Sequence, residues 1–212
     1  MKNIFSIFVI CLLISVNAKA QSVEVTAAYG YQFGSKLNYG ANYIKVQDSD
    51  QFAITLGYEM YDNFQIELSY TRMSTELRIR DIFISPTESR LADLNGDWFF
   101  VGTKRYFSSD VVKPFLGGGL GFVVLTPDNE NQDLAEPGFT YSLSSSTRFA
   151  FGFNGGVNIM LSESVGINLQ GNLYFPVNWA GVYVTPGGAS ISTGSTIILG
   201  GFSGGLVFRV GS

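Results

Sequence analysis

The feature that most constrains this chain is a repeated alternation of apolar side chains with small or polar ones, over segments of roughly ten residues. In the segment 22–33, the odd positions carry Val, Val, Ala, Tyr, Tyr and Phe, whereas the even positions after Ser22 carry Glu, Thr, Ala, Gly and Gln. A period of two is that of a β-strand with one apolar face. Such strands close into a soluble barrel with an apolar interior or into a membrane barrel with an apolar exterior. The direction of the apolar face therefore decides most of the function.

The start of the chain has the features of an export signal. Lys2 supplies a positive charge, residues 4–16 are almost entirely apolar, and Ala18-Lys19-Ala20 is a cleavage site with small outer residues. We expect residues 1–20 to be a cleaved signal peptide, rather than a retained helical anchor, because the apolar stretch is short for a membrane span. Residues 21–212 then form a single domain. Since Cys11 lies within the signal, the mature domain has neither disulfides nor thiolate metal ligands.

The composition favours an apolar exterior. Charged residues make up 14% of the chain, below the roughly 25% of soluble domains, while aromatic residues reach 15%. Outside the signal, the longest apolar stretch, 115–125, is too short and too rich in glycine for a helical span. If the chain is a membrane protein, it therefore spans as strands. With a net charge of −4 and no basic cluster, nucleic acid is not an expected partner.

Eight segments carry the alternation, and helices are disfavoured because the period of two persists through glycine and β-branched residues. The four consecutive apolar residues 98–101 blur the pattern in the fourth segment, so its faces are not assigned. The expected strands are 22–33, 51–61, 64–73, 97–107, 112–124, 149–161, 165–175 and 196–210.

The connections alternate strictly between short and long. The short ones are 62–63, 108–110 and 162–164, and the long ones are 34–50, 74–96, 126–148 and 176–195. All long loops therefore emerge at one end of the sheet, and both termini lie at the other. Aromatic residues gather near both ends, at Tyr58 and Phe64 and at Tyr29, Tyr31, Phe33, Tyr70 and Phe175, as in the two aromatic belts of membrane barrels.

The predicted fold is thus all-β, an eight-stranded antiparallel up-and-down transmembrane β-barrel with short periplasmic turns and long extracellular loops. A lipocalin also has eight strands, so a soluble carrier is the alternative. In that case the polar faces would form the exterior. Those faces are small and rich in amides, whereas a soluble exterior usually carries many Lys and Glu residues.

Two stretches carry a family resemblance, in addition to the signal ending in Ala20. They are Pro-Phe-Leu-Gly-Gly-Gly-Leu-Gly-Phe at 114–122 and Gly-Gly-Leu-Val-Phe-Arg-Val at 204–210. The chain resembles the small outer-membrane barrels of the OmpA/OmpX type, within the outer-membrane β-barrel domain group that includes opacity-type proteins. The resemblance implies the outer membrane of a Gram-negative cell, insertion by the barrel assembly machinery and no cofactor. One departure is that Phe208 is followed by four further residues, whereas such barrels commonly end on an aromatic residue.

Catalysis and metal binding are not expected. The chain has no histidine, the most common general base near neutral pH. The acidic pairs Asp48/Asp50 and Glu130/Asp133 are interpreted as solvated loop residues. The stretch 128–133 lacks the glycine and the final glutamate of an EF-hand loop. No catalytic, cofactor or metal residues are therefore predicted.

A set of charged residues is predicted to face the lumen. The alternation places Glu24 and Arg209 on the polar faces of the first and last strands, so they should approach each other across the closing seam. Buried charges must pair, and an eight-stranded barrel is narrow enough to be filled by its own side chains. We therefore predict a plugged lumen; the alternative is that the charges extend into periplasmic water. The predicted lumen charges are Glu24, Glu59, Glu67, Lys104, Lys113 and Arg209.

The predicted function is that of a non-enzymatic outer-membrane barrel, acting in envelope structure or in surface interaction through its loops. Besides membrane lipid, the expected partner is an extracellular ligand that the sequence does not identify, met by loops with apolar stretches at 82–84 and 179–183. Two alternatives are a narrow channel for small or hydrophobic solutes and a periplasmic lipocalin-like carrier. The candidate contacts to lipopolysaccharide phosphates are Arg72, Arg78, Arg80 and Arg90.

Overall fold

The computed structural model describes most of the chain after the expected signal. The described residues are 22–83, 85–108, 110–134, 143–177, 182–185, 188–191 and 197–211, with backbone alone for 182–185 and 188–191. The predicted signal peptide and the apolar stretch 179–181 lie outside this part. Within the described residues, no helix has the length and apolar character needed to cross a membrane.

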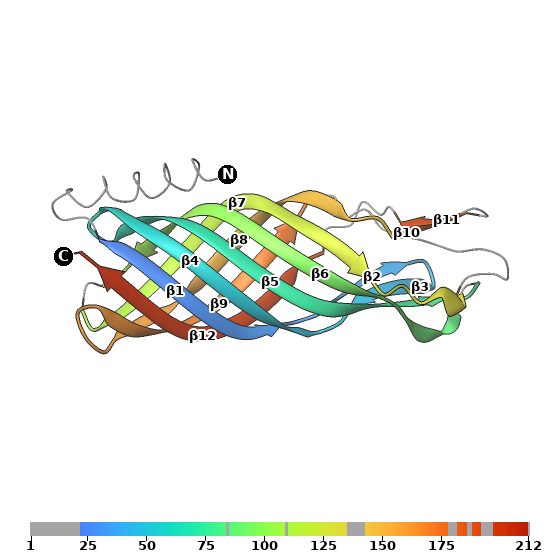
Figure 1. Ribbon diagram of the computed structural model, residues 1–212, viewed down its shortest axis with the longest axis horizontal. Coiled ribbons are helices and arrows are strands. Elements are labelled where there is room, and N and C mark those ends of the chain that lie inside the picture. The colour runs from blue at the N-terminus through green and yellow to red at the C-terminus, as the bar shows by residue number, and fades with distance from the viewer. Residues whose placement is uncertain are drawn as a thin grey trace, which may run out of the picture.

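Eight of the described strands form a closed antiparallel ring, in which each strand pairs with its neighbours along the chain and the last pairs with the first. The start of β1 and the end of β12 lie beside the short turns, and the β2–β3 hairpin lies at the opposite end (Figure 1). The predicted eight-stranded up-and-down barrel is confirmed. The ring strands are β1 (Val23–Gln32), β4 (Ser49–Tyr61), β5 (Phe64–Asp81), β6 (Ser85–Tyr106), β7 (Val112–Asp128), β8 (Ser146–Met160), β9 (Val165–Pro176) and β12 (Leu199–Val210).

The alternation of the sequence separates the two surfaces of the wall. Along β5, the even positions from Ile66 to Tyr70 face outward, whereas Gln65 and Glu67 are buried inside. On β6, Trp98 and Phe100 point inward and their neighbours Phe99 and Val101 point outward, which assigns the faces that the sequence left open. The outward residues form an apolar band around the barrel, as expected of a wall surrounded by lipid.

The long connections 34–50 and 74–96 were predicted to be loops, and this prediction is wrong. Residues 35–46 form a hairpin of β2 (Ser35–Tyr39) and β3 (Asn42–Val46), whose strand β3 pairs with β5. Residues 74–81 continue β5 and residues 85–96 belong to β6, with residues 82 and 83 in a turn after β5. The strands thus extend well past the apolar band. We call residues 35–46 and 74–92 the platform.

The strands of the platform were not predicted because the apolar residues change from the outward face to the inward face there. The odd positions of β5 point inward along its whole length, but they change from polar residues such as Glu67 to Met73, Leu77 and Ile79, all buried. The outward positions become charged at Glu76 and beyond. This exchange is expected where a strand leaves lipid for water, since a strand in water buries its apolar face.

The other long connections are only partly described. The connection 126–148 includes a short 3-10 helix, η2 (Gln132–Leu134), and 176–195 includes the hairpin of β10 (Val182–Thr185) and β11 (Gly188–Ile191). The predicted short turns are confirmed where they are described. At 62–63, Asn63 adopts the left-handed conformation with φ of 63°, which asparagine tolerates better than most residues.

The barrel closes where β1 pairs with β12, and glycine permits the close approach of these strands. An ideal Cβ added to Gly205 would lie 2.0 Å from the carbonyl oxygen of Ala27. Gly204, the next residue back, faces outward, and its added Cβ would meet the flexible side chain of Leu169 at 3.3 Å. Two adjacent glycines therefore differ sharply in how much space surrounds them.

We predict that Gly205→Ala destabilises the barrel by about 1–3 kcal/mol, because the added methyl group clashes with backbone that cannot move without disturbing the seam. Gly204→Ala, the matched control, should change stability by well under half of that. The measurement is reversible urea unfolding in lipid vesicles. Equal effects of both substitutions would contradict the close approach at the seam.

Candidate functional site: the lumen and the platform

Aromatic rings fill the half of the lumen that lies nearer the platform. Trp98 and Phe100 of β6 stack on Tyr174 of β9, with ring centroids 4.9 and 5.2 Å from that of Tyr174. The Tyr174 hydroxyl lies 3.1 Å from Oγ1 of Thr71, so its polar end has a partner. All three rings are buried. Together they form an apolar layer across the barrel, which we call the aromatic layer.

A charged network fills the other half of the lumen. Lys104 pairs with both Glu24, at 3.4 Å, and Glu67. The side chains of these three residues are only 2–6% exposed. Tyr106 donates a 2.6 Å hydrogen bond to Glu24, and Asn158 donates a 3.3 Å hydrogen bond to the same oxygen. The carboxylate of Glu24 is thus held by three donors on two other strands, which offsets the cost of removing it from water.

A second ion pair lies at the short-turn end of the lumen. Arg209 of β12 donates to Glu59 of β4, which also accepts from the hydroxyl of Ser22 and, at 3.3 Å, from the backbone N–H of Asn63. These groups are partly exposed. Lys113 also lies at this end, half-buried near the start of β7.

A small cavity separates the two layers. Its volume is about 40 Å³, enough for only a few water molecules. Its walls include Phe100 and Tyr174 from the aromatic layer and Glu67 from the charged network. The amide oxygen of Asn154, which also lines it, is buried without a hydrogen-bond partner among the described residues. The cavity has a mixed polar and apolar lining and the size of a hydration site, far smaller than a solute pathway.

The structure brings the predicted lumen charges together but in an arrangement that the sequence did not specify. Glu24 does lie directly opposite Arg209 in the register of the seam. Their charged groups, however, pair elsewhere, Glu24 with Lys104 and Arg209 with Glu59. The aromatic layer and Tyr106 were not singled out from the sequence. Tyr106 could have been found, because it lies two residues beyond Lys104 and therefore on the same strand face.

The platform has its own apolar core. Leu37, Ile44 and Val46 of the β2–β3 hairpin are buried, together with Leu77 and Ile79 of β5. They belong to the same cluster as Trp98 and Phe100. The apolar core of the platform is therefore continuous with the barrel interior.

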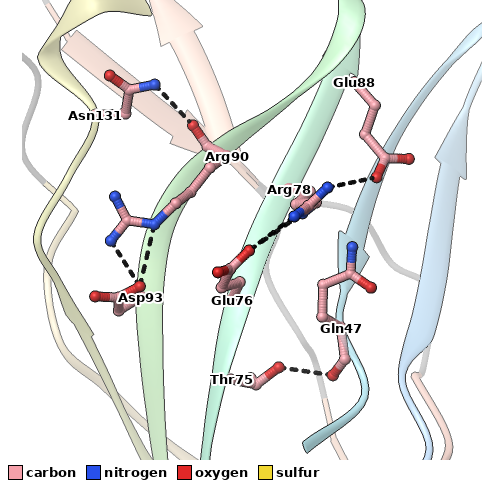
Figure 2. Close-up of polar contacts among 8 residues, drawn as sticks. All are labelled: Gln47, Thr75, Glu76, Arg78, Glu88, Arg90, Asp93 and Asn131. Atoms are coloured by element: carbon pink, nitrogen blue, oxygen red, sulfur yellow. Dashed lines mark hydrogen bonds and ion pairs between the residues drawn. The ribbon is translucent and has the colours of Figure 1, made fainter.

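The outer face of the platform carries interlocked charges. Arg78 of β5 lies between Glu76, at 3.0 Å, and Glu88 of β6, at 3.5 Å, and Arg90 pairs with Asp93 at 2.6 Å (Figure 2). The hydrogen bond from Arg90 lowers the pKa of the Asp93 carboxyl, so this carboxyl stays ionised at neutral pH. Arg78 and Arg90 are therefore already engaged by carboxylates.

Two other predicted arginines lie apart from these pairs. Arg80 has its Nε 3.3 Å from the carbonyl oxygen of Pro86, near the tip of the β5–β6 hairpin. Arg72 lies at the border of the apolar band, where its side chain is 53% exposed and lies 3.7 Å from Asp97. The hydroxyl of Tyr70 donates to the same carboxylate at 2.6 Å. Of the four predicted arginines, Arg72 alone borders the band.

Beside Arg72, an apolar groove of about 460 Å³ runs along the outer wall. Its lining includes Tyr70, Phe99 and Phe122, with Leu68 and Ile54 farther along. The rings of Phe99 and Phe122 stack with centroids 5.1 Å apart. A cation at the edge of an apolar groove suits a ligand with an anionic head and a hydrocarbon chain.

Comparison with known proteins gives one family and a common fold. The model of the outer membrane protein beta-barrel domain matches residues 6–174. OprG from Pseudomonas aeruginosa is 14% identical, with a TM-score of 0.68 over 92% of this chain and 98% of its own. AlkL, solved in DMPC lipid bilayers, is 12% identical, with a TM-score of 0.55 over 93% of both chains. Neisserial surface protein A is 17% identical, with a TM-score of 0.53 over 89% and 96%. A search of curated proteins finds no match.

Removing the cation of the buried network should be costly. We predict that Lys104→Met destabilises the protein by about 3–5 kcal/mol, because Glu24 and Glu67 then remain buried without their counter-charge. Lys113→Met, at the half-exposed end of the same lumen, should cost much less. Urea unfolding in vesicles measures both variants. A loss for Lys104→Met no larger than that for Lys113→Met would show that the network does not hold two ionised carboxylates.

Proposed function

Because the chain belongs to the outer-membrane β-barrel domain family, we propose that it is a non-conducting, non-enzymatic barrel that acts through the platform. The protein resides in the outer membrane. In barrels of this kind the short turns face the periplasm and the long connections face outward. The platform then projects from the cell, where it would support envelope structure or contact a surface ligand.

The observation that supports the proposal is that two chemically different sets of buried side chains, the aromatic layer and the network around Lys104, face into the lumen. The aromatic layer excludes water on the platform side, and the network around Lys104 crosses the periplasmic side. The 40 Å³ cavity lies between them. An ion would have to displace stacked rings and also disrupt buried ion pairs. This favours a plugged barrel over the narrow channel that the sequence left as an alternative.

We also propose that the protein is not an enzyme. The chain lacks histidine, and the buried carboxylates are engaged by Lys104 and Arg209 rather than being free to act as acid or base. We also propose that residues 1–20 are removed on export, and that the barrel assembly machinery inserts the mature chain. The closing strand β12, with Phe208 facing outward, is the segment expected to guide insertion.

For the lipid partner, Arg72 and the adjacent groove support a contact with lipopolysaccharide. The groove would hold an acyl chain, and the guanidinium would meet a phosphate at the membrane border. The other three arginines lie on the platform, beyond the band. Of the four arginines predicted to contact phosphate, we therefore retain Arg72 as the lipopolysaccharide contact.

Conductance in planar bilayers tests the plug. We predict no steady current for the wild-type protein. Trp98→Ala, Phe100→Ala and Tyr174→Ala together remove the aromatic layer, and Glu24→Ser, Glu67→Ser and Lys104→Ser together remove the charges of the network with both signs represented. Each set alone should remain closed, because the other layer still obstructs the lumen, whereas the combined variant should conduct. A steady wild-type current would overturn the plug and favour the channel.

Copurified lipid tests the contact at Arg72. Arg72→Ser should lower the lipopolysaccharide retained per barrel severalfold, because a charge-assisted phosphate contact is lost. Arg105→Ser is the matched control, since Arg105 is an exposed arginine near the periplasmic end of the same wall. Lipopolysaccharide can be quantified by its phosphate after extraction from purified protein. Equal retention by the two variants would refute the contact.

A further inference from the structure

The outermost tip of the platform presents two large apolar side chains to solvent. Phe83 is 93% exposed, more than any other large apolar residue that the structure describes, and Ile82 is 58% exposed. Both lie in the turn between β5 and β6, far beyond the apolar band of the barrel wall. The membrane that surrounds the barrel therefore does not cover them. Such exposure is unfavourable in water unless a partner removes it.

The tip is held in a defined shape. The buried carboxylate of Asp81 accepts hydrogen bonds from the backbone N–H of Phe83 at 2.9 Å, from the side chain of Asn42 at 2.8 Å and from the Tyr39 hydroxyl at 3.0 Å. The amide oxygen of Asn42 accepts from the backbone N–H of Ile82 at 3.1 Å. Burial and the bond to Asp81 raise the pKa of Tyr39, which keeps its hydroxyl protonated as a donor. A tip fixed in this way loses little entropy on binding.

Basic side chains lie on the strands that lead to the tip. Residues 35–46 and 76–90 carry five basic and three acidic side chains, a net charge of +2 in a chain whose total is −4. Lys36 and Lys45 are opposite each other in the register, although like charges in that position repel. Arg80 lies opposite Tyr43, whose ring is 3.5 Å from the Lys36 ammonium.

On this surface, some of the charged side chains form ion pairs and others do not. Glu76 and Glu88 pair with Arg78. None of the ion pairs within the described residues involves Lys36, Lys45 or Arg80. The hydrogen bond from Tyr43 holds the pKa of Glu88 below its ordinary value. The Glu88 carboxyl is therefore ionised at neutral pH, and its partners are Tyr43 and Arg78. Within the described residues, the charges of Lys36, Lys45 and Arg80 are thus not neutralised by an ion pair with a carboxylate.

We propose that the tip docks on the surface of a second, anionic bilayer, opposite the membrane that the barrel spans. Ile82 and Phe83 enter the interfacial region, and Lys36, Lys45 and Arg80 contact lipid phosphates. A lipid surface fits better than a protein pocket, because the two apolar residues form a convex point flanked by long flexible cations. The proposal rests on the outward orientation of the platform in cells.

The test uses the full-length mature barrel in nanodiscs of phosphatidylcholine. Binding to acceptor vesicles is measured by flotation, with phosphatidylcholine vesicles that contain or lack phosphatidylserine. We expect binding to the anionic vesicles that weakens with added salt. Phe83→Ser should reduce it about tenfold, as expected for partial loss of one buried aromatic side chain. Replacing Lys36, Lys45 and Arg80 with Ser should abolish the preference for phosphatidylserine.

Phe107→Ser is the matched control, because Phe107 is 65% exposed at the opposite end of the barrel. It should leave vesicle binding unchanged, and heat-modifiable migration on gels verifies that every variant is folded. Wild-type protein that fails to float with anionic vesicles, or Phe83→Ser protein that floats equally well, overturns the proposal. Binding of a soluble sulfated polysaccharide without vesicle binding overturns it in favour of a polyanion site. Because nanodiscs expose both ends, these outcomes depend neither on orientation in cells nor on lumen conductance.

Discussion

The structure depends on complete pairing of the backbone in a closed ring. Within a membrane, each unpaired backbone N–H or carbonyl costs several kcal/mol, so a sheet that spans it can have no open edge. Here the first and last ring strands pair along their whole shared length, from Val23 opposite Val210 to Gln32 opposite Gly201. The glycines of the seam follow from this requirement, because the closing strands approach too closely for a side chain at Gly205.

Closure with only eight strands makes the lumen narrow, and its contents then follow the surroundings. Beside the periplasm it holds charges, and the buried ones are stabilised by partners, as Glu24 is by Lys104 and Tyr106. Toward the platform it holds stacked rings. Beyond the band the outer surface becomes charged and the interior stays apolar. The same strands therefore carry an outer face suited to lipid in one part and an outer face suited to water in the next. The platform is therefore part of the barrel rather than a set of loops attached to it.

Most of the ring could be predicted from the sequence, since a period of two marks a strand wherever one face is uniformly apolar. The predicted strand ended at Met73 because the apolar residues move to the opposite face there. An alternation with apolar residues at even positions stops at that point, although the strand continues. It was undecided at 98–101 because four consecutive apolar residues fit either face. Parity predicted the lumen charges outside 97–107, whereas Lys104 lies in the segment whose faces were not assigned, and the partners of these charges were not predicted. Glu24 and Glu67 both lie opposite Gly57 in the register, yet they meet at Lys104 on β6, which β4 and β5 separate from β1, and the pattern of one strand does not reveal such a contact.

The sequence by itself determined the strands of the barrel, their up-and-down order, the apolar exterior and the residues that face inward, because these depend on local periodicity and on the length of each connection. Only the tertiary structure decided which inward side chains touch. Contacts across the lumen join strands that are distant in the chain, and they depend on the stagger of the closed ring and on side-chain length. For the same reason, only the structure showed that Trp98 reaches Tyr174, and that Asp81 and Asn42 hold Ile82 and Phe83 at the tip.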